Sequence, residues 1–255
     1  MKNFFLFCTI ALCSGSLFAQ NPAKCYHLDG WDVPHRINKA ISNGYAVTGN
    51  SDGGAIVLVV DENGNELVKK NIQKNDLYGF DIHALDSSGY IISGFDYIYG
   101  EPGFYVPYIL RVDPQGNEVW YRELRKQSDS WGTPPITSKL VLKDNLITVV
   151  IRDTLLTLDT DGAVVFAKDL RDITLPVVLA LDIQYADSYY YVLGLRTFNW
   201  SILKISDSFN SATVFNFVPT IKNINDFILT RDKGFLVSGQ NTSGAWHLVK
   251  LDSTG

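Results

Sequence analysis

The sequence has few of the cysteines that cross-link a protein chain. It has 3 cysteines in 255 residues, and two of them, Cys8 and Cys13, lie in a segment that we expect to be removed. Cys25 alone would remain, and a single thiol cannot form a disulfide within its own chain. Stability must therefore come from burial of apolar side chains. Apolar residues at the helical period are also missing from every stretch of about ten residues, which excludes a mainly helical protein.

Charge and motif content exclude further classes. The chain carries 22 Lys and Arg against 27 Asp and Glu, a net charge of −5, without a basic cluster that could bind nucleic acid. Beyond the N-terminus no apolar run is long enough to span a membrane. The phosphate-binding glycine loop and the Gly-x-Ser-x-Gly nucleophile motif are absent. We predict neither a cofactor nor a metal, because the histidines lack metal-ligand spacing. They are His27, His35, His83 and His247.

The N-terminus resembles a secretion sequence. Lys2 supplies a positive start, residues 4–12 form a short apolar run, and residues 14–19 are small or apolar up to Ala19. This pattern predicts a signal peptide over residues 1–19, cleaved after Ala19. We therefore expect a secreted or cell-surface protein whose folded domain covers residues 20–255.

One sequence pattern is repeated five times along the chain. Each copy has a Gly-aromatic-aliphatic-aliphatic strand and a second aliphatic strand that runs into Asp-x-x-Gly, and the clearest copies begin at Gly44, Gly89 and Gly234. Repetition of short strands at about 45 residues predicts an all-β protein, a β-propeller of four-stranded blades. The glycine in each hairpin turn, both the one that opens a copy and the one of Asp-x-x-Gly, is expected to supply the positive φ that the hairpin needs.

The spacing of the copies predicts the blade boundaries. The expected blades are residues 36–70, 80–124, 137–168, 177–217 and 226–255, and the second should contain strands at 82–85, 90–93, 108–112 and 118–123. Two arrangements remain open. Residues 24–28 match a fourth strand and could complete the last blade, which closes a ring and removes its open edges. The chain could instead be part of a larger propeller.

Two segments carry a resemblance to known proteins. Residues 107–120 (PYILRVDPQGNEVW) and 247–255 (HLVKLDSTG) resemble the propeller repeats of exported bacterial surface proteins, which often have a C-terminal sorting domain that is not found here. The resemblance implies a propeller fold but no particular activity. An Asp-x-x-Gly turn followed by Trp120 is also similar to quinoprotein-type blades, which implies an envelope assembly scaffold. The other copies have Val68, Phe166 or Val214 at the Trp position.

Ligand contacts are expected on the face that carries the irregular loops. Aromatic side chains there suit sugar faces or peptide side chains. The insertion at residues 95–106 is the strongest candidate because its tyrosines have no counterpart in other copies, and its acids could accept hydrogen bonds from sugar hydroxyls. About half of the loop aromatics should only fill the space between blades. The predicted ligand-binding residues are Trp31, Tyr78, Asp96, Tyr97, Tyr99, Glu101, Trp131 and Trp200.

We therefore predict a non-catalytic module that binds glycan or protein. The alternative is a glycoside hydrolase, since some five-bladed propellers use carboxylates that project into the central channel. The candidate carboxylates are Asp32, Asp81, Asp182 and Asp226. Asp81 and Asp226 stand at equivalent places before an inner strand, which favours a structural role.

Overall fold

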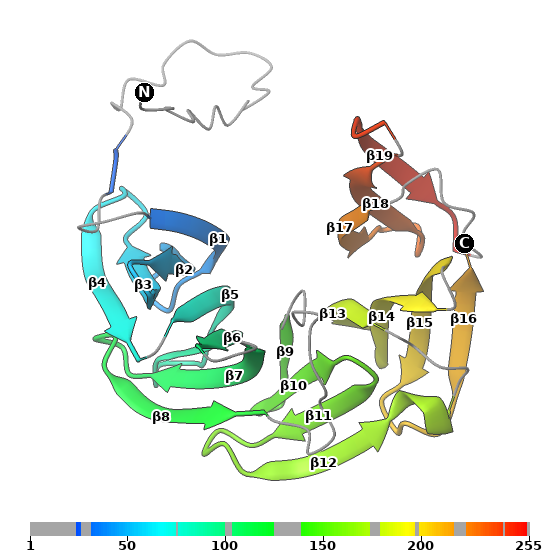
Figure 1. Cartoon of the computed structure of the whole chain (residues 1–255), viewed down its shortest axis with the longest axis horizontal. Coiled ribbons are helices and arrows are strands. Elements are labelled where there is room, and N and C mark those ends of the chain that lie inside the picture. Colours follow the sequence, from blue (N-terminus) through cyan, green and yellow to red (C-terminus); the bar gives the residue numbers. More distant parts are fainter. Residues whose placement is uncertain are drawn as a thin grey trace.

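The chain is an all-β propeller arrangement, as predicted. The computed structural model describes residues 24–26, 32–74, 76–99, 104–124, 139–173, 179–196, 199–216, 223–241 and 243–253. Within these residues, 19 strands form five antiparallel sheets, or blades, around a common axis (Figure 1). Four blades have four strands and the last has three.

Each blade is a meander that starts at the axis and runs outward (Figure 1). Blade 1 consists of β1 (Asp32–Lys39), β2 (Tyr45–Ser51), β3 (Gly54–Val60) and β4 (Glu66–Gln73), and blade 2 of β5 (Leu77–Ala84), β6 (Tyr90–Ile98), β7 (Phe104–Val112) and β8 (Glu118–Glu123). Blade 3 consists of β9 (Leu140–Lys143), β10 (Leu146–Ile151), β11 (Thr154–Leu158) and β12 (Val164–Asp169), followed by the 3-10 helix η1 (Leu170–Asp172). Blade 4 consists of β13 (Leu179–Ala186), β14 (Tyr189–Arg196), β15 (Asn199–Ser206) and β16 (Ala212–Asn216), and blade 5 of β17 (Asn223–Leu229), β18 (Phe235–Gln240) and β19 (Trp246–Leu251).

The core consists of apolar clusters between neighbouring blades. Side chains of a strand point alternately to the two faces of its sheet, so a blade with a neighbour on each side is apolar on both. Burial of one Leu or Phe side chain contributes about 1.5–3 kcal/mol, and each interface buries many. Each cluster has members from both blades, such as Val57 and Ile92 between blades 1 and 2, Ile109 and Ile147 between 2 and 3, Leu155 and Val192 between 3 and 4, and Ile202 and Phe227 between 4 and 5.

The glycine that opens the clear repeats has a different role from the one predicted. The glycines of the Asp-x-x-Gly turns have the predicted positive φ at Gly64, Gly116 and Gly162. Among the three opening glycines only Gly89 has one, +126°, so the prediction is wrong for Gly44 and Gly234. All three glycines instead allow the end of the third strand to approach closely. An added Cβ would lie 1.8 Å from the Val60 carbonyl oxygen at Gly44, 1.9 Å from that of Val112 at Gly89, and 2.3 Å from that of Leu251 at Gly234.

The insertion at residues 95–106 extends a hairpin. β6 and β7 remain paired through Tyr97 with Tyr105 and Ile98 with Phe104. The strands predicted at 90–93 and 108–112 were therefore too short, since β6 runs on to Ile98 and β7 begins at Phe104. The strand predicted at 118–123 was correct. Aromatic and β-branched residues continue across the insertion, and these residues fit a pleated sheet surface.

The first and last blades face each other across an opening of the arc (Figure 1). Among the described residues, β19 pairs with β18 alone. Among the described residues, the side chains of Lys24 and Tyr26 hydrogen-bond to the β3–β4 turn of blade 1, and the completion of blade 5 by residues 24–28 stays a prediction. Residues 27 and 28 of the predicted strand lie outside the described residues.

Candidate functional site

Seven rings form a continuous group across blades 1 and 2, which we call the aromatic surface. Neighbouring rings have centroids 4.5–5.0 Å apart, within the range of favourable aromatic contacts. The order of contact runs from the inner strand β1 to the tip of the β6–β7 hairpin. The aromatic surface consists of His35, Phe80, Phe95, Tyr105, Tyr97 and Tyr99 in that order, with Tyr78 tilted against Phe95.

Two β-bulges position the inner end of this surface. The register of β1 shifts between Pro34 and Arg36, and that of β5 between Gly79 and Asp81. Each bulge leaves one residue without a pairing partner and re-aims its side chain. The residues concerned are His35 and Phe80, and their rings stack at 4.5 Å.

Asp76 fixes the outer end of the aromatic surface. Its Oδ2 accepts a hydrogen bond from the Tyr99 hydroxyl at 2.8 Å and from the Tyr78 hydroxyl at 3.4 Å. The hydrogen bond to Asp76 raises the pKa of Tyr99, and burial followed by the charge of Asp76 raises the pKa of Tyr78. Both hydroxyls therefore stay protonated at neutral pH. Tyr99 is 73% exposed, so its ring faces solvent while its hydroxyl is held.

Some of the predicted site residues lie on the aromatic surface, others are buried, and others lie outside the described residues. Tyr78, Tyr97 and Tyr99 belong to the aromatic surface. Asp96 does not face a ligand, because it is 1% exposed and accepts hydrogen bonds from the Asp76 amide and the Tyr121 hydroxyl. Trp200 is a core residue, 9% exposed in the cluster between blades 4 and 5. Trp31, Glu101 and Trp131 lie outside the described residues.

Sequence reasoning missed His35, Phe80 and Asp76. The two bulge residues could have been found from a repeated pattern, since each directly precedes the charged residue of an inner strand (His35-Arg36 and Phe80-Asp81). Asp76 gives no comparable pattern, because its hydrogen bond to Tyr99 spans 23 residues of the chain.

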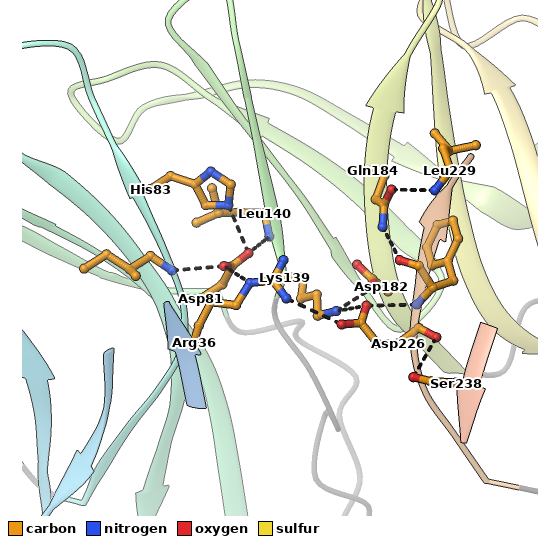
Figure 2. A network of polar contacts seen from close by, with 12 residues as sticks. Arg36, Asp81, His83, Lys139, Leu140, Asp182, Gln184, Asp226, Leu229 and Ser238 are labelled. Carbon is orange, nitrogen blue, oxygen red and sulfur yellow. Dashed lines mark hydrogen bonds and ion pairs between the residues drawn. The ribbon is translucent and has the colours of Figure 1, made fainter. Parts of the chain in front are cut away.

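A second candidate site lies at the axis, where all five blades contribute polar side chains (Figure 2). Lys139, just before β9, places Nζ 2.6 Å from Asp182 Oδ2 and 2.7 Å from Asp226 Oδ1. Arg36 of β1 places Nε 3.3 Å from Asp81 Oδ1 and Nη1 3.5 Å from Asp226 Oδ2. Three of the four candidate carboxylates thus meet in one network. The fourth, Asp32, lies at the start of β1 opposite Ser51.

The axial acids share a local geometry. Asp81, Asp182 and Asp226 each stand directly after the register shift of their inner strand. Asp81 Oδ1 accepts from the amide of Ile82 at 3.0 Å, and Asp226 Oδ1 accepts from the amide of Phe227 at 2.8 Å. A carboxylate that binds the backbone beside a bulge stabilises that bulge, which supports the structural role expected from their equivalent places.

Asp182 and Asp226 differ in protonation. Burial raises the pKa of Asp182 to about 8, against the opposing effect of Lys139. Burial also acts to raise the pKa of Asp226, but the hydrogen bond from Asp182 and the charges of Lys139 and Arg36 outweigh it, so this pKa is lowered. The raised pKa of Asp182 favours its neutral form, and the lowered pKa of Asp226 favours its ionised form. The Asp182 side chain is 2% exposed and that of Asp226 is 40% exposed.

Neither a metal site nor a membrane-spanning helix is found among the described residues. No group of three or more His, Cys, Asp or Glu side chains there is placed to hold a metal ion. None of the helical segments described has the length and apolar character that a membrane crossing requires.

The comparisons with known proteins show the fold. No protein-family model and no curated protein sequence matches the chain. A protein of unknown function from Bacteroides caccae is similar in structure, with a TM-score of 0.57, 13% identity, and 90% of this chain and 81% of that chain covered. The AfRom2 CNH domain has a TM-score of 0.54, 10% identity and coverage of 95% and 71%. YCF48 from Cyanidioschyzon merolae has a TM-score of 0.51, 12% identity and coverage of 89% and 69%.

Proposed function

We propose that this propeller is an exported, non-catalytic module that binds a glycan, or else a protein, through the aromatic surface. The observation that carries the proposal is the arrangement of Tyr99, whose ring is 73% exposed while its hydroxyl is fixed by Asp76. A ring that is already held loses little conformational freedom on binding, so more of the contact energy contributes to affinity. The sequence of residues 1–19 and the resemblance to exported propeller repeats support export.

Ring geometry favours a sugar as the first partner to test. Tyr97 and Tyr99 meet edge to face at 4.9 Å, and Tyr105 contacts Tyr97 at 4.9 Å, so the outer rings present differently oriented faces to solvent. Aromatic faces bury the apolar C–H side of a pyranose, and a nearby carboxylate can accept hydrogen bonds from its hydroxyls. Asp76 supplies a carboxylate beside Tyr99, since its Oδ2 accepts the hydrogen bond from the Tyr99 hydroxyl.

Replacement of Tyr99 by alanine should reduce glycan binding about ten-fold, which corresponds to about 1.4 kcal/mol for the lost ring contact. Tyr97→Ala should have a similar effect, because the variant loses both its own ring and the support of Tyr99. Tyr99→Phe keeps the ring and removes only the anchor to Asp76, so the loss should be smaller. Binding would be measured on an array of immobilised glycans and then by calorimetry with the best oligosaccharide.

Trp246→Ala is the matched control, because Trp246 is 67% exposed on β19 of blade 5, whereas the aromatic surface belongs to blades 1 and 2. This control should leave binding unchanged. An equal loss for Trp246→Ala and Tyr99→Ala, or the absence of any glycan or protein ligand that depends on Tyr99, contradicts the proposal.

The axial network is the observation that favours a glycoside hydrolase as the second candidate. A neutral Asp182 beside an ionised Asp226 provides an acid and a base of different pKa, which glycoside hydrolysis requires. Asp182 is 2% exposed and bound to Lys139, however, so a substrate has little access to its proton. Hydrolysis of aryl glycosides that disappears in Asp182→Asn, with the fold intact, would support this candidate over the binding module.

A further inference from the structure

The outer end of the aromatic surface combines tyrosine rings with a carboxylate. Asp76 lies directly before β5, and its backbone carbonyl accepts a hydrogen bond from the Tyr97 amide at 3.0 Å. This bond continues the β5–β6 pairing by one residue, so Asp76 stands opposite Tyr97. Tyr97 pairs in turn with Tyr105 of β7. Asp76, Tyr97 and Tyr105 therefore form one row across neighbouring strands.

The side chains of this row lie on one face of blade 2, because opposed residues of antiparallel strands point to the same face of a sheet. Tyr99 joins them from the end of β6, since its hydroxyl donates to Asp76 Oδ2 at 2.8 Å. Three tyrosine rings and one carboxylate are thus gathered in one place. We call Asp76, Tyr97, Tyr99 and Tyr105 the tyrosine–aspartate group.

The three rings of this group face in different directions. Tyr97 meets Tyr99 at an interplanar angle of 85° with centroids 4.9 Å apart, and it meets Tyr105 at 50° and 4.9 Å. A single flat ring offers one face to a ligand, whereas rings at such angles offer faces on more than one side of a small group. Tyr99 and Tyr105 are 73% and 37% exposed, so a ligand in solvent can reach them.

One oxygen of the Asp76 carboxylate is left for a ligand. The two tyrosine hydroxyls that bind this carboxylate, those of Tyr99 and Tyr78, both donate to Oδ2. In the part of the chain that the structure describes, no hydrogen bond or ion pair to Oδ1 is found. The Asp76 side chain is only partly buried, and an ionised carboxylate accepts hydrogen bonds at both oxygens. Oδ1 is therefore the oxygen that can accept from a bound donor.

The charges around Asp76 make this end of the surface negative. A second carboxylate lies beside it, because Asp96 Oδ1 accepts from the Asp76 amide at 3.2 Å. Lys74 is paired with Glu118, whose Oε1 lies 2.9 Å from the lysine Nζ. Within the described ranges, no Lys, Arg or His lies at ion-pair distance from the Asp76 carboxylate. The hydrogen bond to Asp76, followed by the charge of that residue, already raises the pKa of Tyr99.

Tyrosine rings beside a carboxylate have the chemistry that recognises an ammonium group. The negative face of an aromatic ring attracts a cation that lies within about 6 Å of the ring centroid. An ammonium group has N–H donors and no acceptor, so it requires acceptors such as Asp76 Oδ1 and tyrosine hydroxyl oxygens. A carboxylate or sulfate group on a ligand would instead be repelled by Asp76.

We propose, on the basis of the glycan-binding function proposed above, that the glycan carries a protonated amine and that the tyrosine–aspartate group binds this amine. The sugar ring that bears the amine packs on the exposed face of Tyr99. Its ammonium group lies against the rings of Tyr97 and Tyr105 and donates a hydrogen bond to Asp76 Oδ1. The ligand class is thus an amino sugar with a free amine, in place of a neutral or an acidic sugar.

Two oligosaccharides that differ only at the nitrogen test the proposal. A chitosan pentamer has free amines, and a chitin pentamer has the same backbone with each amine acetylated and uncharged. Calorimetry would be carried out at about pH 5.5, which is below the pKa of amines and above that of an ordinary aspartate. The chitosan pentamer should bind about ten-fold more tightly, the effect of one charge-assisted contact with neighbouring rings.

Asp76→Asn removes the charge and keeps a side-chain oxygen that can accept the Tyr99 hydroxyl. This variant should lose about ten-fold in affinity for the chitosan pentamer, and its affinity for the chitin pentamer should change by less than about two-fold. Asp86→Asn is the matched control, because it removes one charge from an exposed turn at the other end of β5, where asparagine tolerates the φ of +44°. The control should bind both pentamers as the unmodified protein does, which excludes a general attraction between an acidic protein and a polycation.

The outcomes separate this proposal from the proposed function. Equal affinity for the two pentamers, with both weakened by Tyr99→Ala, overturns the amine site and leaves the glycan-binding function in place. If neither pentamer nor any other glycan binds in a way that depends on Tyr99, both proposals fail. A lysine-containing peptide that needs Asp76 and Tyr99, while the chitosan pentamer does not bind, also overturns the amine site on a glycan, since a protein would then supply the cation.

The unmodified protein gives an answer even if Asp76→Asn does not fold. Salt screens a contact between charges that are exposed to solvent. The affinity for the chitosan pentamer should therefore fall as the salt concentration rises, while that for the chitin pentamer should not. The same salt dependence for both pentamers overturns the proposal.

Discussion

Gly89→Ala is expected to destabilise the protein by about 3–5 kcal/mol, a large effect for one added methyl group. The new Cβ would lie 1.9 Å from the carbonyl oxygen of Val112, and that oxygen belongs to the backbone at the end of β7. Residue 89 also has a φ of +126°, a conformation that residues with a side chain rarely adopt. Urea unfolding followed by circular dichroism would measure the loss, and the melting temperature should fall by roughly 10 °C.

Gly244→Ala separates the steric contact from the backbone conformation. Gly244 also has a positive φ, +80°, but no atom lies within 4 Å of its added Cβ. This variant should lose only about 1–2 kcal/mol, the cost of a left-handed conformation for alanine. Equal losses at the two glycines would show that conformation alone explains the repeat glycine, contrary to our interpretation.

The glycine that opens the repeat shows which features of the fold can be predicted from the sequence and which cannot. The repeat phrase predicted hairpins, blade spacing and an all-β propeller, because strand periodicity and turn residues are local properties. The reason for the glycine was predicted wrongly at Gly44 and Gly234, because the atom it avoids belongs to the end of another strand. Contacts of that kind depend on how the strands pair, which the repeat phrase does not encode.

The aromatic surface was predictable only in part. Tyr97 and Tyr99 were identified because they interrupt the repeat. His35 and Phe80 were missed because a bulge, and not a change in composition, directs their rings to the same place. Trp200 was misassigned for the opposite reason. It stands at the second residue of β15, close to a loop in sequence, yet the packing of blade 5 on blade 4 buries it.

Asp182→Asn is expected to stabilise the protein at neutral and mildly alkaline pH. Burial raises the pKa of Asp182 to about 8, whereas an unfolded Asp titrates near 3.9. Between these values the unfolded chain loses the Asp182 proton and the folded protein retains it, so the unfolded state binds fewer protons. The free energy of unfolding must then fall as pH rises. The contribution of this proton is fully present below about pH 4 and is lost as the pH approaches 8.

An asparagine at this position has the shape of the neutral acid and does not titrate. The variant and the unmodified protein should have similar stability near pH 4.5. Near pH 8 the variant should be more stable by about 2–3 kcal/mol. Linkage allows at most roughly 1.4 kcal/mol for each unit by which folding raises the pKa, so this expected gain is below the limit. Urea unfolding at several pH values in this window would measure the difference.

Asp226→Asn provides the control of opposite sign. The pKa of Asp226 is lowered, so its charged form favours the folded state, and its removal should reduce stability above about pH 4. A stability difference between Asp182→Asn and the unmodified protein that does not change with pH would mean that Asp182 is ionised beside Lys139. The axial network would then be an ion pair of buried charges. If the difference grows with pH as expected, the neutral acid is the state in which Asp182 holds Asp226 and Lys139 together at the centre of the five blades.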